Sequence, residues 1–338
     1  PALNKPSLPI LVGTFCFPPS FSSTPQPANM PINPTPELQQ RLGRLEFLAA
    51  QAVEGFITGM HKSPFHGFSV EFAEHRLHNP GESTKHLDWK LYARTDKMFV
   101  KRYEEETNLR CQLVLDVSRS MAYPDGITLD DDRMSKLKFA VLASAALIEL
   151  LRRQRDAVGL SLFAESLDLQ TPARSSRAHH RMLYDKLEGL LSEPADPRPT
   201  SAIDALHQIA EATPRRSLIL VFSDLLDRSE DPEALISALQ HLRHNKHEVV
   251  VFHLLDASTE VDFAFPDRPT RFVDLETGEE LKLHPTEVRE AYVERMAKLQ
   301  KTLRDRCGAH GMDWVDVDVA QGVLPVLTSY LTKRAKLF

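Results

Sequence analysis

The chain has 338 residues, of which 42% are hydrophobic and 26% are charged, and its formal net charge is −6. These proportions are typical of a soluble globular protein and exclude a disordered or collagen-like chain. The acidic balance argues against a dedicated nucleic-acid-binding protein, which would carry a basic excess. The three cysteines, Cys16, Cys111 and Cys307, form neither a disulfide framework nor a CxxC metal motif, so we expect a cytoplasmic protein.

The N-terminal residues 1–34 are predicted to form an extended, disordered tail. Ten of the 23 prolines fall within the first 36 residues, and proline at this density removes the hydrogen bonds of helices and sheets. The apolar run Leu8–Phe17 is not followed by a small-x-small cleavage site, so we interpret it as part of this tail and not as an export signal. No stretch reaches the roughly 18 to 20 apolar residues that a membrane span requires.

Residues 35–107 are predicted to form a small subdomain of helices and strands. Thr35 followed by Pro36 is typical of a helix start, and apolar residues recur at helical spacing as far as Gly59. Alternating apolar residues predict a strand near Phe68–Phe72. A short helix and a further strand are expected within His86–Tyr103.

Residues 108–338 alternate between short apolar strands and amphipathic helices, with a hairpin expected near 270–284. This alternation predicts crossover connections and therefore a doubly wound, mostly parallel α/β sheet that helices cover on both faces. The predicted strands are Gln112–Leu115, Ala157–Phe163, Leu218–Phe222, Val249–Leu254 and Asp313–Val317, and the predicted helices are Ser135–Arg153, Arg177–Leu191, Ser201–Ala212, Pro232–His244, Thr286–Arg306 and Val323–Lys336.

Polar residues follow the first and third strands of this domain. The first strand ends in Asp116-x-Ser118-x-Ser120, the third ends shortly before Asp224, and Thr200 stands at the start of the helix between them. Ligands bind at the carboxyl ends of strands in open parallel sheets, so we expect these five side chains to meet at one edge. Hydroxyl and carboxylate oxygens suit one divalent cation, Mg²⁺ or Mn²⁺, better than zinc. The alternative is that the serines and the threonine only cap helices.

These residues resemble the metal-ion-dependent adhesion site of von Willebrand factor A domains. The resemblance implies that Ser118, Ser120 and Thr200 contact the ion, and that Asp116 and Asp224 bind it directly or through water. It also implies a von Willebrand factor A-like fold for residues 108–338.

An upstream set of residues narrows the resemblance to the DUF58 family. The set comprises Pro80-Gly81-Glu82, Asp88-Trp89, Ala93-Arg94 and Val100-Lys101-Arg102-Tyr103-Glu104. Relatives of this kind are usually associated with MoxR-type AAA+ ATPases. The resemblance therefore implies a protein-binding adaptor that works with such an ATPase in assembling or activating a client protein.

The expected mechanism is binding without catalysis, in which an acidic side chain of a partner completes the metal shell. The same five residues could instead activate water in a metal-dependent hydrolase, but the sequence shows no obvious general base. Neither GxGxxG nor GxxxxGK[ST] is present, so no nucleotide cofactor is expected. The basic and aromatic residues of 85–103 leave a nucleic-acid-binding module as a third possibility, although a solvated face with its aromatic residues in the core is the favoured interpretation.

Overall fold

The structure is a computed structural model that describes residues 44–57, 71–77, 89–104, 109–124, 127–192, 202–226, 232–274 and 279–335. The predicted tail at 1–34 lies outside the described residues, as do Thr35, Pro36, Phe68 and the expected hairpin turn at Thr277 and Gly278. The predicted domain boundaries at 34 and 107 therefore stay predictions.

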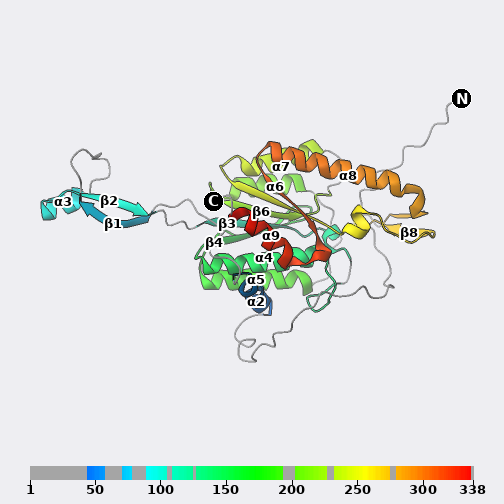
Figure 1. Cartoon of the computed structure of the whole chain (residues 1–338), viewed down its shortest axis with the longest axis horizontal. Coiled ribbons are helices and arrows are strands. Elements are labelled where there is room, and N and C mark those ends of the chain that lie inside the picture. Colours follow the sequence, from blue (N-terminus) through cyan, green and yellow to red (C-terminus); the bar gives the residue numbers. More distant parts are fainter. Residues whose placement is uncertain are drawn as a thin grey trace.

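The centre of the molecule is a six-stranded sheet with the strand order β10-β7-β6-β3-β4-β5 (Figure 1). Five strands are parallel, and β5 pairs antiparallel with β4. The strands are β3 (Arg110–Asp116), β4 (Ala157–Phe163), β5 (Leu167–Gln170), β6 (Leu218–Ser223), β7 (Glu248–Leu255) and β10 (Asp313–Asp318). The predicted mostly parallel α/β sheet is confirmed. Strand β5 was not predicted, because it has only four residues and none of them is fully buried.

Helices cover both faces of this sheet, which makes the fold doubly wound (Figure 1). One face carries α2 (Arg44–Ile57), α4 (Lys136–Arg153), α5 (Arg177–Ser192) and α9 (Val323–Ala335), and the other carries α6 (Ala202–Ala212), α7 (Pro232–Arg243) and α8 (Pro285–Ala309). Each face has its own apolar core, because successive side chains of a strand point to opposite faces. Phe222 and Phe252, for example, stack with ring centroids 4.7 Å apart in the α4 layer.

Helix α4 illustrates how the sequence builds one of these layers. Ser135 is its N-cap, and the Ser135 hydroxyl accepts a hydrogen bond of 3.1 Å from the backbone N–H of Lys138. Nearly every following residue as far as Leu151 is buried, because the sheet lies beneath the helix and α2, α5 and α9 flank it. Burying each large apolar side chain stabilises the fold by about 1.5–3 kcal/mol.

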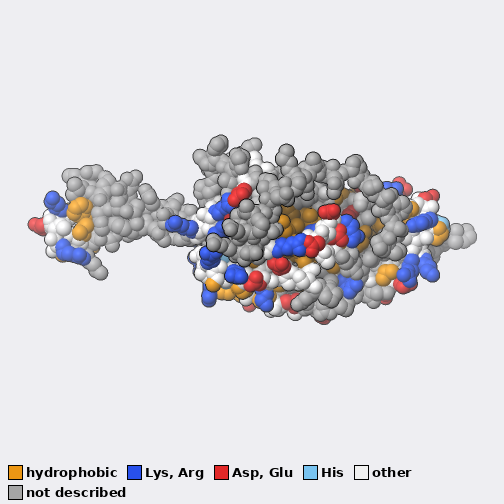
Figure 2. All heavy atoms as spheres, turned by 90° about the horizontal axis from the view of Figure 1, so that it is seen from below, with side chains coloured by type: hydrophobic (Ala, Val, Ile, Leu, Met, Phe, Trp, Pro, Cys, Tyr) orange, Lys and Arg blue, Asp and Glu red, His pale blue; other side chains and the backbone are white. Residues whose placement is uncertain are grey.

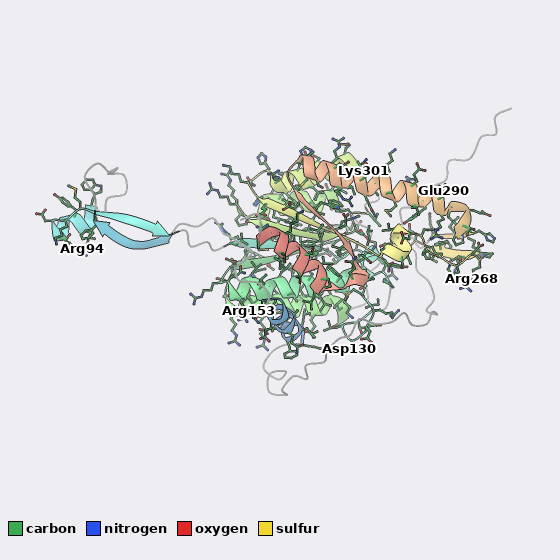
Figure 3. The ribbon with its side chains drawn as sticks, viewed as in Figure 1. Arg94, Asp130, Arg153, Arg268, Glu290 and Lys301 are labelled. Carbon is green, nitrogen blue, oxygen red and sulfur yellow. The ribbon has the colours of Figure 1, made fainter. Side chains whose placement is uncertain are left out.

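Helix α2 packs on the sheet domain, although it precedes the predicted boundary at residue 107. Its buried residues, Leu45, Ala49 and Val53, belong to the same core as α4 and α5. At the surface, Arg44 forms an ion pair with Asp130 in the loop before α4. Arg153 at the end of α4 lies 3.7 Å from Glu54. Figure 3 shows Asp130 and Arg153 near α2.

Two further strand pairs lie outside the central sheet. Strand β1 (Glu71–Leu77) pairs antiparallel with β2 (Phe99–Glu104), and α3 (Trp89–Thr95) lies between them in the chain. Strand β8 (Thr270–Val273) pairs antiparallel with β9 (Glu280–Leu283). The aromatic residues of 85–103 were expected in a core, and this is wrong for Trp89, the first residue of α3, which is 61% exposed.

No helix in the described part of the chain combines the length and the apolar character needed to span a bilayer. Figure 2 shows one face of the molecule, on which the described Lys and Arg side chains are interspersed with Asp and Glu.

Candidate functional site

The candidate site lies at the carboxyl ends of β3 and β6. These strands are neighbours, and the chain passes from β3 to β4 on one side but places β6 on the other. The strand order therefore reverses between β3 and β6, and in open α/β sheets ligands bind at such a switch point. The register pairs Leu115 with Phe222, so Asp116 and Ser223 leave the sheet side by side.

Asp116 is fully buried, and both of its carboxylate oxygens accept hydrogen bonds. The backbone N–H of Ser118 donates to Oδ1 at 2.9 Å, and the Ser223 hydroxyl donates to Oδ2 at 2.6 Å. Burial raises the pKa of Asp116 to about 7, with a further contribution from the negative charge of Asp224, against the opposing effect of these hydrogen bonds. The hydrogen bonds to this carboxylate come from neutral donors, and within the described part of the chain it forms no ion pair, so the site favours the binding of a cation.

Ser118 and Ser120 place their hydroxyl groups together beside Asp116. Their Oγ atoms are 3.0 Å apart, and both side chains are buried. The short 3₁₀ helix η2 (Arg119–Ala122) turns the chain here, which brings these alternating residues to one point. The Ser118 side chain makes no capping hydrogen bond to η2, so simple capping does not account for it.

The donor set fits a hard divalent cation such as Mg²⁺ or Mn²⁺ better than zinc. Neighbouring oxygens in an octahedral Mg²⁺ shell lie about 3 Å apart when each bond is about 2.1 Å long, which is the spacing of Ser118 Oγ and Ser120 Oγ. No group of three or more His, Cys, Asp or Glu residues among those described is arranged to hold a metal. The donors that the described residues offer beside β3 are the hydroxyl groups of Ser118 and Ser120 and the carboxylate of Asp116.

Asp224 is also fully buried, and its surroundings differ from those of Asp116. Its Oδ1 accepts the backbone N–H of Leu226 at 3.1 Å, and its Oδ2 accepts a hydrogen bond of 2.7 Å from Lys136 Nζ. His253 donates through Nε2 to the Asp224 carbonyl at 3.0 Å, and burial lowers the pKa of His253 to about 4, so it is neutral. Thr200, the fifth predicted ligand, lies outside the described residues.

Three residues at this edge were missed by the sequence analysis: Ser223, Lys136 and Glu260. One signal for Lys136 was available, because a lysine in the first turn of a helix faces the positive end of the helix dipole. Such a residue needs a nearby anion, and Asp224 and Glu260 supply two. Glu260 follows the exit of β7, in the short helix η3 (Ala257–Val261).

The family model described as "Protein of unknown function DUF58" matches residues 74–302, more than half of the chain. The chain belongs to the DUF58 family. This confirms the predicted membership, and the match includes Asp116, Ser118, Ser120 and Asp224 as well as the three residues that the sequence analysis missed.

Among curated proteins, this DUF58 chain is 26% identical over 234 residues to "Uncharacterized protein Rv1480" of Mycobacterium tuberculosis, covering 69% of this chain and 68% of the relative. Similar solved structures include "conserved hypothetical protein BatB" from Bacteroides thetaiotaomicron, with 18% identity, a TM-score of 0.38 and coverage of 68% of this chain and 99% of that chain. A "von Willebrand factor type A" structure from Catenulispora acidiphila has 15% identity and a TM-score of 0.31, with coverage of 60% and 44%.

The residues on which the DUF58 resemblance was based are only partly described. Pro80, Gly81, Glu82 and Asp88 lie outside the described residues. Trp89 and Arg94 lie on α3 and are both exposed, and Figure 3 shows Arg94 on this helix.

Proposed function

We propose that this DUF58 protein is a non-enzymatic, divalent-metal-dependent protein-binding adaptor. Its metal site is formed by Asp116, Ser118 and Ser120, together with Thr200 and with Asp224 at its border. The observation that carries the proposal is the pair of buried serine hydroxyls, 3.0 Å apart, beside a buried carboxylate at the switch point of the sheet.

The residues of the chain have distinct tasks in this proposal. Ser118 and Ser120 offer neutral oxygen donors, and Asp116 supplies negative charge that backbone and hydroxyl donors hold in one orientation. A bound Mg²⁺ or Mn²⁺ offers a coordination position that a carboxylate of a partner protein can fill. Because serine hydroxyls leave the charge of the ion largely uncompensated, the edge favours an acidic side chain from the partner.

The proposed partners are a client protein that presents this acidic side chain and a MoxR-type AAA+ ATPase. The argument for the ATPase is the family resemblance, since proteins of this type are usually associated with such ATPases. The adaptor would bring the client and the ATPase together in assembly or activation of the client.

Calorimetric titration with Mg²⁺ and with Mn²⁺ tests the metal site. The wild type is expected to bind one equivalent, and Asp116→Asn is expected to abolish binding. Asp156→Asn is the matched control, because Asp156 is also a buried aspartate but lies at the opposite end of the strands. It accepts a hydrogen bond from the backbone N–H of Leu109, just before β3 begins. Unchanged binding in Asp116→Asn, or equal loss in both variants, contradicts the assignment.

Pull-down of the purified MoxR-type ATPase tests the adaptor role. Wild type and Asp116→Asn are compared at constant Mg²⁺, because a chelator would also remove the metal from the nucleotide of the ATPase. Retention of the ATPase or client by the wild type and its loss in the variant support the proposal. Equal retention by both proteins contradicts it, and Mg²⁺-dependent turnover of phosphoester or peptide substrates would favour the hydrolase.

A further inference from the structure

The ammonium group of Lys136 is enclosed between two carboxylates beside the candidate metal site. Lys136 Nζ lies 2.7 Å from Asp224 Oδ2 and 2.6 Å from Glu260 Oε1. The side chains of Lys136 and Asp224 are completely shielded from solvent, and that of Glu260 is 7% exposed. An ion pair this deeply buried differs from a surface pair, because solvent neither screens it nor offers replacement partners.

The position of Lys136 is unfavourable without these partners. Lys136 is the first residue of α4, where the helix dipole repels a cation. Asp224 and Glu260 provide the two negative charges that compensate the ammonium group at this position, since an oxygen of each lies within hydrogen-bonding distance of Nζ.

The two carboxylates are oriented toward this charge by the backbone. The N–H of Leu226 donates to the second oxygen of Asp224 at 3.1 Å, and the N–H of Asp256 donates to the second oxygen of Glu260 at 2.8 Å. Two carboxylate oxygens thus face one cation, which is how a chelating pair faces a metal ion. Lys136 joins the start of α4, the exit of β6 and the helix η3 through this contact.

We propose that Lys136 is the internal cation of this edge and takes the position between Asp224 and Glu260 that a divalent ion would otherwise occupy. Because Lys136 already neutralises these two carboxylates, an external metal ion binds at Asp116, Ser118 and Ser120 instead. Lys136 is thus a positioning residue that sets how many metal ions the edge takes. The biological meaning of the inference rests on the proposed function, since both concern the same edge.

Replacing Lys136 by methionine tests the proposal, because methionine retains the length of the chain as far as Cε and omits only the Nζ position. The Lys136→Met protein, purified with and without Mn²⁺, is expected to melt below the wild type without metal. Mn²⁺ is expected to raise its Tm by more than it raises that of the wild type, with one additional equivalent bound in calorimetry. Lys136→Arg retains the charge and is expected to show the metal response of the wild type.

Two further variants separate a charge effect from general loss of packing. In Lys136→Met/Glu260→Gln one of the two carboxylates is neutral, so the additional metal response is expected to disappear. Leu187→Ala, at a fully buried position of α5, is a destabilised control whose Tm is expected to show only the wild-type response. If Mn²⁺ raises the Tm of Lys136→Met no more than that of this control, the proposal is wrong. Failure of Lys136→Met to fold even with Mn²⁺ overturns it as well.

A second measurement uses Asp224→Asn, which leaves the Lys136–Glu260 contact in place. Because Asp224 is already paired with Lys136, this substitution is expected to weaken Mg²⁺ binding less than tenfold, whereas Asp116→Asn abolishes the binding. Equal loss in the two variants contradicts the inference. If the wild type binds no metal but Lys136→Met does, the proposed function fails and the role of Lys136 stands.

Discussion

The exits of β3 and β6 each place a fully buried aspartate at the same edge of the sheet, but they hold it by opposite means. Neutral donors hold Asp116 at the exit of β3, namely a backbone N–H and the Ser223 hydroxyl. An enclosed ammonium group holds Asp224 at the exit of β6. The two carboxylates are therefore chemically unequal, although the sequence analysis assigned both to the same ion.

This difference indicates how one edge can combine stability with binding. A buried charge is costly unless a partner compensates it. Asp224 has the ammonium group of Lys136 as its counter-charge. The hydrogen bonds to Asp116 only partly offset the cost of burying its charge, so its pKa is raised to about 7. The first arrangement strengthens the fold, and the second leaves negative charge available to an external cation.

The largest expected effect comes from breaking the Lys136–Asp224 contact. Lys136→Met should lower the free energy of unfolding in metal-free buffer by about 3–5 kcal/mol, because it leaves two buried carboxylates without their cation. Asp224→Asn should cost less, because Glu260 still pairs with Lys136. The double variant Lys136→Met/Asp224→Asn should lose less free energy of unfolding than the two single variants lose in sum, as measured by urea denaturation. An additive result would show that the contact does not couple them.

The next effect concerns Asp156, a buried aspartate that forms no ion pair with the residues that the structure describes. Burial raises its pKa to about 7, although the backbone N–H of Leu109 donates to it. A raised pKa means that the contribution of this group to stability is fully present below about pH 4 and is lost as the pH rises through about 7. The Tm of Asp156→Asn should therefore decline less than that of the wild type between pH 4 and pH 8. Parallel Tm profiles would contradict this.

A smaller change in stability is expected for Asp116→Asn, despite its loss of metal binding. The amide oxygen of asparagine can still accept the N–H of Ser118, and the repulsion from Asp224 disappears. The free energy of unfolding should change by about 1 kcal/mol in metal-free buffer, as measured by urea denaturation. A loss as large as that expected for Lys136→Met would mean that the two aspartates have equivalent structural roles.

The smallest effect is expected at the surface pair between Arg44 and Asp130. Both side chains are more than half exposed, so water screens the pair and offers replacement partners. Arg44→Ala should lower the free energy of unfolding by less than about 1 kcal/mol. Thermal unfolding checks this value, and a larger loss would show that the pair has a greater part in holding α2 on α4.

Much of the fold could be predicted from the sequence, because the elements of the sheet domain are locally encoded. The run Ala157–Phe163 is apolar except for Ser161 and became β4 with the same bounds, and the predicted helix Ser135–Arg153 became α4, with Ser135 as its cap. Strand β5 was missed, since its pattern is short and its residues are only half-buried or exposed. The burial of Leu45 against α4 was not predicted either, because helical periodicity identifies an apolar face but not the element that covers it.

The sequence by itself determined which chemical groups leave the strands, and it predicted the proximity of Asp116, Ser118 and Ser120 because two-residue spacing is a local property. Only the tertiary structure decided which groups neutralise one another. Lys136 lies 88 positions before Asp224 and 124 before Glu260, and their contact depends on the strand order and on where α4 begins over the sheet. Contacts between residues so far apart in the sequence cannot be predicted from periodicity, since they result from the packing of the whole domain.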